Sequence, residues 1–196
     1  MIPKIIHQIW IGPKPCPDWT HKWRLPGWGY RLWTDDDFLS LDNRELYERY
    51  VQDHCWNGAA NVARVEILLS EGGVYIDADT EFVTPLDEAS FMGEDLFVLK
   101  SPNDKQRLTN AVMGATPNHP AIANYKKKLS EVRDVIHPSW QKTGALLMAD
   151  AFRGFNVEKL HPGTFFERDM RNRPVAYDGT RYGKHLYGTT RKLYES

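Results

Sequence analysis

The stretch EGGVYIDADT, residues 71–80, determines how this sequence is interpreted. Its two glycines are suited to end a helix, and the apolar residues after them predict a short buried strand over residues 74–77. Asp77 and Asp79 stand at the end of that strand. Side chains at positions i and i+2 of an extended segment point the same way. The two carboxylates are therefore expected to converge just beyond the strand.

Two neighbouring carboxylates repel each other unless a cation lies between them. Carboxylate oxygens are the ligands that Mg²⁺ and Mn²⁺ prefer, and Mg²⁺ in proteins often also binds substrate phosphates. In open α/β sheets, ligands bind outside the carboxyl ends of the strands. Asp77 and Asp79 thus predict a metal–diphosphate site. The alternative is a simple turn, in which each Asp accepts hydrogen bonds from nearby backbone N–H groups.

The pattern around this stretch is typical of an α/β protein. Asn57 can cap a helix over 58–71, which the two glycines end. Further strands are expected over 4–11, 30–34, 95–100 and 110–116, and further helices over 43–54, 119–136 and 143–154. Asp35, Asp36 and Asp37 can cap another short helix, and residues 12–29 are expected to form a loop. A mixed sheet follows from this order.

The composition is that of an ordinary globular protein. The 196 residues are 41% hydrophobic and 26% charged, with a net charge of −1. This composition predicts one domain over 1–196 and argues against a nucleic-acid or membrane role by bulk charge. Cys16 and Cys55 do not have the spacing of a zinc site. The opening MIPKIIHQIWIG has no signal-peptide pattern and no transmembrane segment is predicted, so a cytoplasmic location is expected.

Two segments carry a family resemblance. Residues 58–82, GAANVARVEILLSEGGVYIDADTEF, resemble the DXD-containing glycosyltransferases of family 32, which include fungal-type mannosyltransferases and, more distantly, the glucosylating bacterial toxins. The opening PKIIHQIWIG, residues 3–12, resembles the first strand of the same enzymes. The resemblance implies a GT-A-type nucleotide-sugar transferase fold, with a mixed, mostly parallel sheet flanked by helices.

The resemblance also implies a reaction. A hexose would move from a UDP- or GDP-sugar donor to an acceptor, with retention of configuration at the anomeric carbon. Mn²⁺ or Mg²⁺ would bridge the protein and the donor diphosphate. The acceptor class stays open and includes a glycan, a lipid-linked sugar and a protein side chain.

The resemblance assigns roles to four residues near the DXD motif. Asp79 is similar in position to the principal metal ligand, and Asp77 to a residue that contacts the donor ribose and sugar hydroxyls and supports the metal. Arg64 is similar to the cation that faces the donor sugar and phosphate. Asn61 stands where the family often has Asp as a hydrogen-bond partner of the sugar.

Three further residues are assigned in the same way. Trp10 resembles the aromatic wall for the donor base, and Asp36, by a looser match, reaches the base or ribose. His185 resembles a histidine near the C-terminus that completes the metal site. The family places a Ser-Trp pair after this histidine, whereas this chain has Thr189-Thr190, so the Trp of a donor lid is missing.

Each assigned residue also has a purely structural interpretation. Arg64 lies on a mostly apolar helix, so it needs an anionic partner and could simply form an ion pair with one of the two aspartates. Trp10 could pack in the core, Asn61 could cap a helix or lie on the surface, and His185 could be a surface histidine.

Two other functions compete with a transferase. A phosphohydrolase of the haloacid-dehalogenase type also has two aspartates after a strand, but its motif has Thr or Val where this chain has Glu81. A nucleotide-sugar-binding module without catalysis is the second alternative. Asn61 and the missing Trp after His185 favour it.

Overall fold

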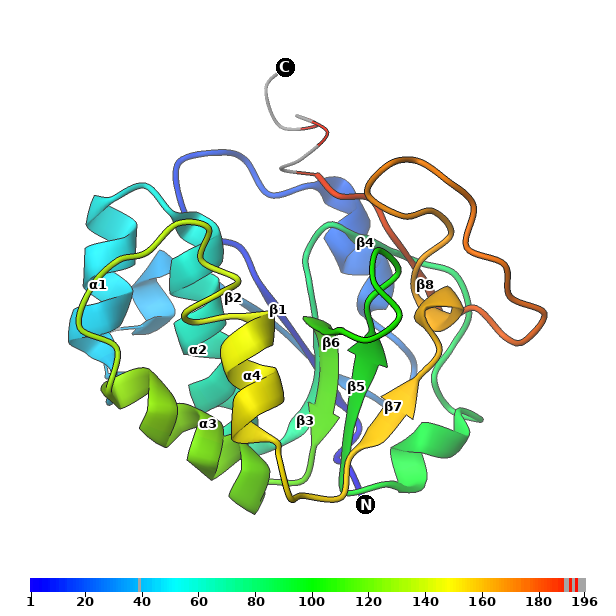
Figure 1. Ribbon diagram of the computed structural model, residues 1–196. Helices are drawn as coiled ribbons and strands as arrows, with labels where there is room; N and C mark the ends of the chain where they lie inside the picture. The colour runs from blue at the N-terminus through cyan, green and yellow to red at the C-terminus, as the bar shows by residue number, and fades with distance from the viewer. Residues whose placement is uncertain (39, 189–190, 192, 194–196) are drawn as a thin grey trace.

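The computed structural model describes residues 1–38, 40–188, 191 and 193. A six-stranded sheet forms its centre, with the strand order β2-β1-β3-β6-β5-β7 (Figure 1). The strands are β1 (Ile5–Ile9), β2 (Gly29–Trp33), β3 (Gly73–Ile76), β5 (Leu96–Lys100), β6 (Leu108–Ala115) and β7 (Glu158–Leu160). The five strands predicted from apolar runs are all present, with ends within two residues of the expected ones.

The sheet is mixed and mostly parallel. β1 runs parallel to both β2 and β3, and β5 runs parallel to β7. In this sheet β6 is the antiparallel member, paired with β3 on one side and β5 on the other. This arrangement confirms the predicted fold class. It also places the carboxyl ends of β1 and β3 next to each other, where parallel sheets bind ligands.

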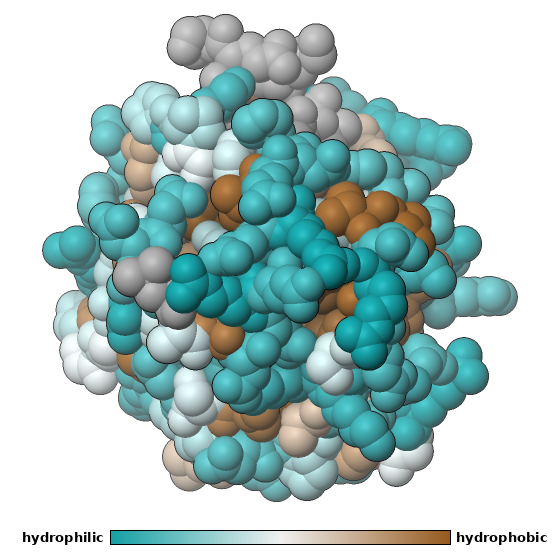
Figure 2. All heavy atoms as spheres, turned by 90° about the vertical axis from the view of Figure 1, so that its left-hand side faces the viewer, coloured by the Kyte–Doolittle hydropathy of each residue, from teal (hydrophilic) through white to brown (hydrophobic). Residues whose placement is uncertain are grey.

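The α-helices cover one face of the sheet. They are α1 (Arg44–Gln52), α2 (Trp56–Glu71), α3 (Pro120–Ser130) and α4 (Ala145–Ala151). The short 3₁₀ helices are η1 (Asp18–Trp23), η2 (Asp35–Phe38), η3 (Ser90–Gly93) and η4 (Pro162–Thr164). α2 packs along the sheet, with α1 and α3 beside it (Figure 1). The face of the molecule that carries α1 is mostly hydrophilic, with scattered apolar residues (Figure 2).

Strand β3 contributes to both faces of the sheet because its side chains alternate. Val74 and Ile76 join an apolar cluster with Trp23, Phe91 and other residues on one face. Tyr75 points to the opposite face, into the cluster that includes α2 and α3. β3 is thus buried on both sides, as its continuous apolar run predicts. The helix before it ends at Gly72, whose φ of 66° suits glycine.

A small second sheet follows directly from the DXD motif. β4 (Thr80–Phe82) pairs antiparallel with β8 (Gly183–His185), and Thr80 lies opposite His185. Leu186 N–H then donates to the backbone oxygen of Asp79 at 2.8 Å. The C-terminal part of the chain is thereby brought against the end of β3. The sequence pattern did not predict β4, β7 or β8.

Several predicted helix ends were wrong. The helix predicted over 58–71 begins at Trp56, so Asn57 lies inside it and Cys55 precedes it. α3 ends at Ser130 rather than 136, because β-branched residues and a proline at 138 follow. α4 begins at Ala145, since Thr143 and Gly144 belong to the preceding turn. The expected loop 12–29 contains η1.

Among the described residues, no helix combines the length and the apolar character needed to cross a membrane. Thr189-Thr190 lie outside the described residues, so the predicted loss of a lid tryptophan stays a prediction.

Candidate active site

Asp77, Asp79 and His185 form a compact cluster at the carboxyl end of β3. One ligand atom from each lies within 4.8 Å of the others. His185 Nε2 is 3.2 Å from Asp79 Oδ1 and 3.5 Å from Asp77 Oδ2. The cluster brings together two residues that are two positions apart in the sequence and one that is more than a hundred residues away. β8 is the element that delivers the third, because its last residue pairs with Thr80.

Two backbone N–H groups of the C-terminal segment donate to side chains of the cluster. Gly188 N–H donates to Asp79 Oδ2 at 2.8 Å, and Tyr187 N–H donates to His185 Nδ1 at 3.1 Å. The second bond leaves Nε2 of the imidazole as the nitrogen that faces the carboxylates. Because Nδ1 accepts this bond, the ring proton of neutral His185 lies on Nε2, which faces the carboxylates as a donor. A metal-bound histidine instead donates through the ring nitrogen that does not bind the metal.

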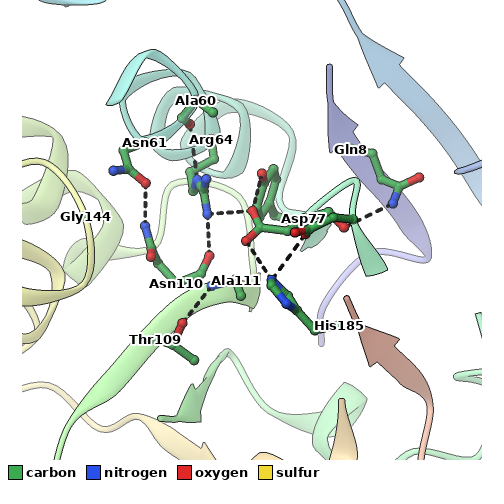
Figure 3. A network of polar contacts seen from close by, with 12 residues as sticks. Gln8, Ala60, Asn61, Arg64, Asp77, Thr109, Asn110, Ala111, Gly144 and His185 are labelled. Carbon is green, nitrogen blue, oxygen red and sulfur yellow. Dashed lines mark hydrogen bonds and ion pairs between the residues drawn. The ribbon is translucent and has the colours of Figure 1, made fainter. Parts of the chain in front are cut away.

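Arg64 is the buried cation of the site, with 4% of its surface exposed. Its Nη1 lies 3.1 Å from Asp77 Oδ1 and donates to the backbone oxygen of Asn110 at 2.6 Å (Figure 3). The guanidinium also stacks on the ring of Tyr75, 4.3 Å from its centroid. Tyr75 O–H donates to the same Asp77 oxygen at 2.7 Å. Oδ1 of Asp77 is thus held by two donors.

Asn61 lies one helical turn before Arg64 and is part of a buried amide network. Its Oδ1 accepts from Asn110 Nδ2 at 2.8 Å (Figure 3). Its Nδ2 donates to Thr143 Oγ1 at 3.3 Å. A Cβ added at Gly144 would lie 2.9 Å from Asn61 Nδ2, so the turn before α4 approaches closely. Asn61 therefore connects α2, β6 and the 139–144 turn.

The cluster forms part of the floor of a cavity of about 400 Å³. Apolar and aromatic side chains make up most of its walls, as is usual in ligand sites. The residues that line it are Ile9, Trp10, Ile11, Pro13, Lys14, Trp56, Asn57, Ala60, Asn61, Arg64, Tyr75, Asp77, Ala78, Asp79, Asn110, Pro138, Ser139, Trp140, Met170, His185 and Tyr187.

Asp77 and Asp79 differ in the direction of their pKa shifts. Burial raises the pKa of both carboxyls. At Asp77 the Arg64 guanidinium and hydrogen bonds from His185 and Tyr75 outweigh burial, so its pKa is lowered. At Asp79 burial and the charge of Asp77 outweigh the opposing charge of His185, so its pKa is raised. Burial lowers the pKa of His185, but the two carboxylates outweigh this and the pKa is raised.

Six of the seven predicted site residues line this cavity; Asp36 does not. Asp36 lies exposed on η2, whereas its neighbour Asp35 accepts hydrogen bonds from Gly12 N–H. Trp10 forms part of the wall, and its indole N–H donates to the Lys14 backbone oxygen at 2.7 Å. The donor-binding roles of Trp10 and Asp36 stay predictions.

Two polar residues of the site were missed from the sequence. Tyr75 could have been found, because it precedes Asp77 by two positions on one strand and so shares its face. The sequence did not point to Asn110, because a single Asn at the start of an apolar strand matches no site motif. Its place in the site comes from its hydrogen bonds to Asn61 and Arg64.

Comparisons with known proteins agree with this geometry. Residues 22–98 match the family model described as "Glycosyltransferase sugar-binding region containing DXD motif". An uncharacterized glycosyltransferase of Acanthamoeba polyphaga mimivirus is 30% identical over 77% of this chain and 64% of its own length. Inositol phosphoceramide mannosyltransferase 2 of Schizosaccharomyces pombe is 29% identical over 85% of this chain and 51% of its own.

A third relative is the mannosyl phosphorylinositol ceramide synthase CSH1 of Saccharomyces cerevisiae. It is 32% identical over 68% of this chain and 36% of its own length. The chain therefore spans between about a third and two thirds of these relatives. Together, the matches confirm the predicted resemblance: this chain is related to the DXD-containing glycosyltransferases, including fungal mannosyltransferases.

A solved structure supports the fold independently. The structure described as "PaToxG Glycosyltransferase" superposes with a TM-score of 0.61 over 77% of this chain and 69% of its own, at 17% identity. At that identity the likeness concerns the fold alone. It agrees with the GT-A-like arrangement of the sheet and helices.

Proposed function

We propose that this chain is a metal-dependent glycosyltransferase that moves a hexose from a UDP- or GDP-sugar to an acceptor. The observation that carries the proposal is the cluster of Asp77, Asp79 and His185 at the floor of a cavity, with Arg64 beside it. The relation to DXD-containing glycosyltransferases supports the same reaction class.

The donor set of the cluster fits Mn²⁺ or Mg²⁺. Two carboxylates and one imidazole suit Mn²⁺, and the carboxylates also suit Mg²⁺. The separations of 3.2 and 3.5 Å are close to the ~3 Å between adjacent ligand atoms of a small octahedral ion. A bound ion would supply Lewis-acid stabilisation of the diphosphate leaving group. Asp79 would be the principal ligand and Asp77 would support it. His185 would join them through Nε2 once the ring proton has left that nitrogen, which requires the Tyr187 N–H bond to Nδ1 to break.

The other residues would bind and orient the donor. Arg64 keeps a positive charge next to the cluster and would stabilise negative charge on the leaving diphosphate. Asn61 would keep the 139–144 turn at the cavity wall through Thr143. Trp10 would face the donor base, and Asp36 would reach the base or ribose.

The scarcity of other acidic groups supports the retention of configuration that the family resemblance implies, because inversion needs a separate general base. Among the described residues that line the cavity, the carboxylates are Asp77 and Asp79, and both belong to the cluster. We therefore propose front-face attack: the bond from the anomeric carbon to phosphate oxygen breaks, and the bond to the acceptor oxygen forms on the same face. The leaving phosphate takes the acceptor proton. The reacting carbon passes through an oxocarbenium-like state.

The relatives suggest the sugar and the acceptor. Two of them are named for mannosyl transfer to a phosphoinositol ceramide. We propose a mannosyl donor and, as acceptor, the polar headgroup of a phosphate-bearing lipid. A glycan and a protein side chain are the other acceptor classes that a panel has to include.

The first test is nucleotide release from a panel of UDP- and GDP-sugars, with Mn²⁺, with Mg²⁺ and with EDTA. Transferases of this kind hydrolyse their donor slowly, so no acceptor is needed. We expect release from one donor, dependent on metal, and its loss in Asp79→Asn, which keeps size and shape. Full activity of Asp79→Asn would refute the role of the cluster.

The same samples distinguish the alternatives. A metal-dependent rise in melting temperature with nucleotide, without turnover of any donor or acceptor, would indicate a binding module. A phosphohydrolase would release phosphate from simple phosphate esters. Its nucleophile would be Asp77, which does not suit that role because Arg64 and Tyr75 already hold Oδ1.

A further inference from the structure

Three segments contact one another beside the cavity and are here called the cavity rim: residues 101–107, 138–142 and 168–173. Two of them contribute side chains that line the cavity, Trp140 and Met170. The 101–107 segment joins them, because the Arg107 guanidinium lies 5.5 Å from the Trp140 ring centroid and Asn103 Oδ1 accepts from Met170 N–H at 2.8 Å. The 101–107 segment therefore contacts both of the other segments of the rim.

The cavity rim exposes large apolar side chains. Met170 is 52% exposed and Trp140 is 39% exposed. Apolar side chains that stay exposed beside a ligand site commonly mark an interaction surface. Trp in particular favours the boundary between water and lipid, because its ring is amphipathic.

The cavity rim is also strongly basic. Its three segments contain six Lys or Arg and two Asp, a net charge of +4, whereas the whole chain has a net charge of −1. Both acidic residues are already paired within the rim, Asp104 with Arg107 at 3.0 Å and Asp169 with Arg173 at 2.7 Å. In the part of the chain that the structure describes, Lys105, Lys142 and Arg171 are exposed and form no ion pair.

We propose that the cavity rim docks on an anionic lipid bilayer. Met170 and Trp140 would enter the headgroup region, and Lys105, Lys142 and Arg171 would contact acidic headgroups. This inference rests on the proposed function in one respect, namely that the acceptor is a membrane lipid. Docking by the rim would hold the cavity opening at the height of the lipid headgroups, where the acceptor hydroxyl lies.

The test is sedimentation of the full chain with vesicles of phosphatidylcholine alone and with about one third phosphatidylserine. We expect binding to the anionic vesicles, weakened by salt. Lys105→Glu/Lys142→Glu/Arg171→Glu should lower the partition coefficient by about 100-fold, since each basic residue near an anionic surface contributes roughly fivefold. None of the three residues lines the cavity, so donor hydrolysis in solution should be unchanged.

A matched control reverses three exposed basic residues elsewhere, in Lys127→Glu/Arg153→Glu/Lys159→Glu. This variant has the same net charge as the rim variant and differs from it only in where the charges lie. If vesicle binding depends on the rim, this control should keep most of its binding. Met170→Ser should weaken binding by about tenfold, because one apolar side chain no longer enters the bilayer. Melting temperatures confirm that each variant is folded.

The outcomes separate this inference from the proposed function. Equal binding by the two triple variants, or no preference of the unaltered chain for phosphatidylserine, would overturn docking by the rim even if donor turnover is normal. Loss of vesicle binding in the rim variant, with unchanged donor turnover, would support it. Vesicle binding with that pattern, but no turnover of any donor, would support docking and contradict the proposed function.

Discussion

His7 is a buried histidine that the structure holds in its neutral form. It lies in β1 with no exposed surface. Trp33 Nε1–H donates to His7 Nδ1 at 3.1 Å, so Nε2 must bear the ring proton, which faces the Gly72 backbone oxygen at 3.0 Å. Protonation of Nδ1 would place two N–H groups against each other. Burial is the main cause of the lowered pKa of His7, about 4 instead of 6.5, and Arg31 lowers it further.

The lowered pKa makes stability depend on pH. Between pH 6.5 and about 4 the unfolded chain binds a proton at this position and the folded chain does not, so stability falls as pH falls. The difference corresponds to about 3.4 kcal/mol at 1.36 kcal/mol per pH unit. About 2 kcal/mol of this is lost by pH 5. At pH 7 the contribution is fully present.

The assay is urea unfolding at a series of pH values from about 7.5 to about 4, a range that includes the pKa of His7 in both the folded and the unfolded chain. His7→Gln is the comparison, because its amide can accept from Trp33 and donate to Gly72 without titrating. It should be less stable at pH 7 and lose less stability on acidification. Parallel pH profiles for the two proteins would refute the reasoning, since all other titrating groups are common to both.

Substitutions at three other positions should change the free energy of unfolding, each measured by urea unfolding at neutral pH. Arg64→Met should cost about 3 kcal/mol, because the Asp77 carboxylate stays buried without its cation, and Arg64→Lys should cost less; equal stability of Arg64→Met would contradict this. Tyr75→Phe should cost about 1 kcal/mol for one hydrogen bond to Asp77. Gly58→Ala should cost about 1–3 kcal/mol despite better helix propensity, because the new Cβ would lie 2.2 Å from the Tyr50 ring; a gain in stability would show that the ring moves aside.

Except for β7, whose sequence Glu-Lys-Leu is not an apolar run, the strands of the central sheet could be predicted because each is an apolar run bounded by glycine, proline or polar residues. β8 could not, because Gly183–His185 is three residues long and has no apolar pattern. Its position depends on pairing with β4, about a hundred residues earlier. His185 was therefore found through family resemblance and not through any local property of its segment.

The helix boundaries show a different limit. Asn57 is a good capping residue by type, yet α2 begins one residue before it, at Trp56. The Trp56 indole packs against Gly12, where an added Cβ would lie 2.8 Å from the ring. The first residue of α2 thus packs against the loop that follows β1. Local capping preferences of about 1 kcal/mol are too small to resist packing of a tryptophan.

The charges of the site explain why metal and donor should bind together. Arg64 (+1), Asp77 (−1) and Asp79 (−1) have a sum of −1, and the Arg64–Asp77 ion pair leaves the excess on Asp79. A diphosphate would be repelled by this arrangement. With a divalent cation bound and His185 neutral, the same groups sum to +1 and attract it. Since the cation changes the sign of the site, nucleotide affinity should depend on metal even where no acceptor is present.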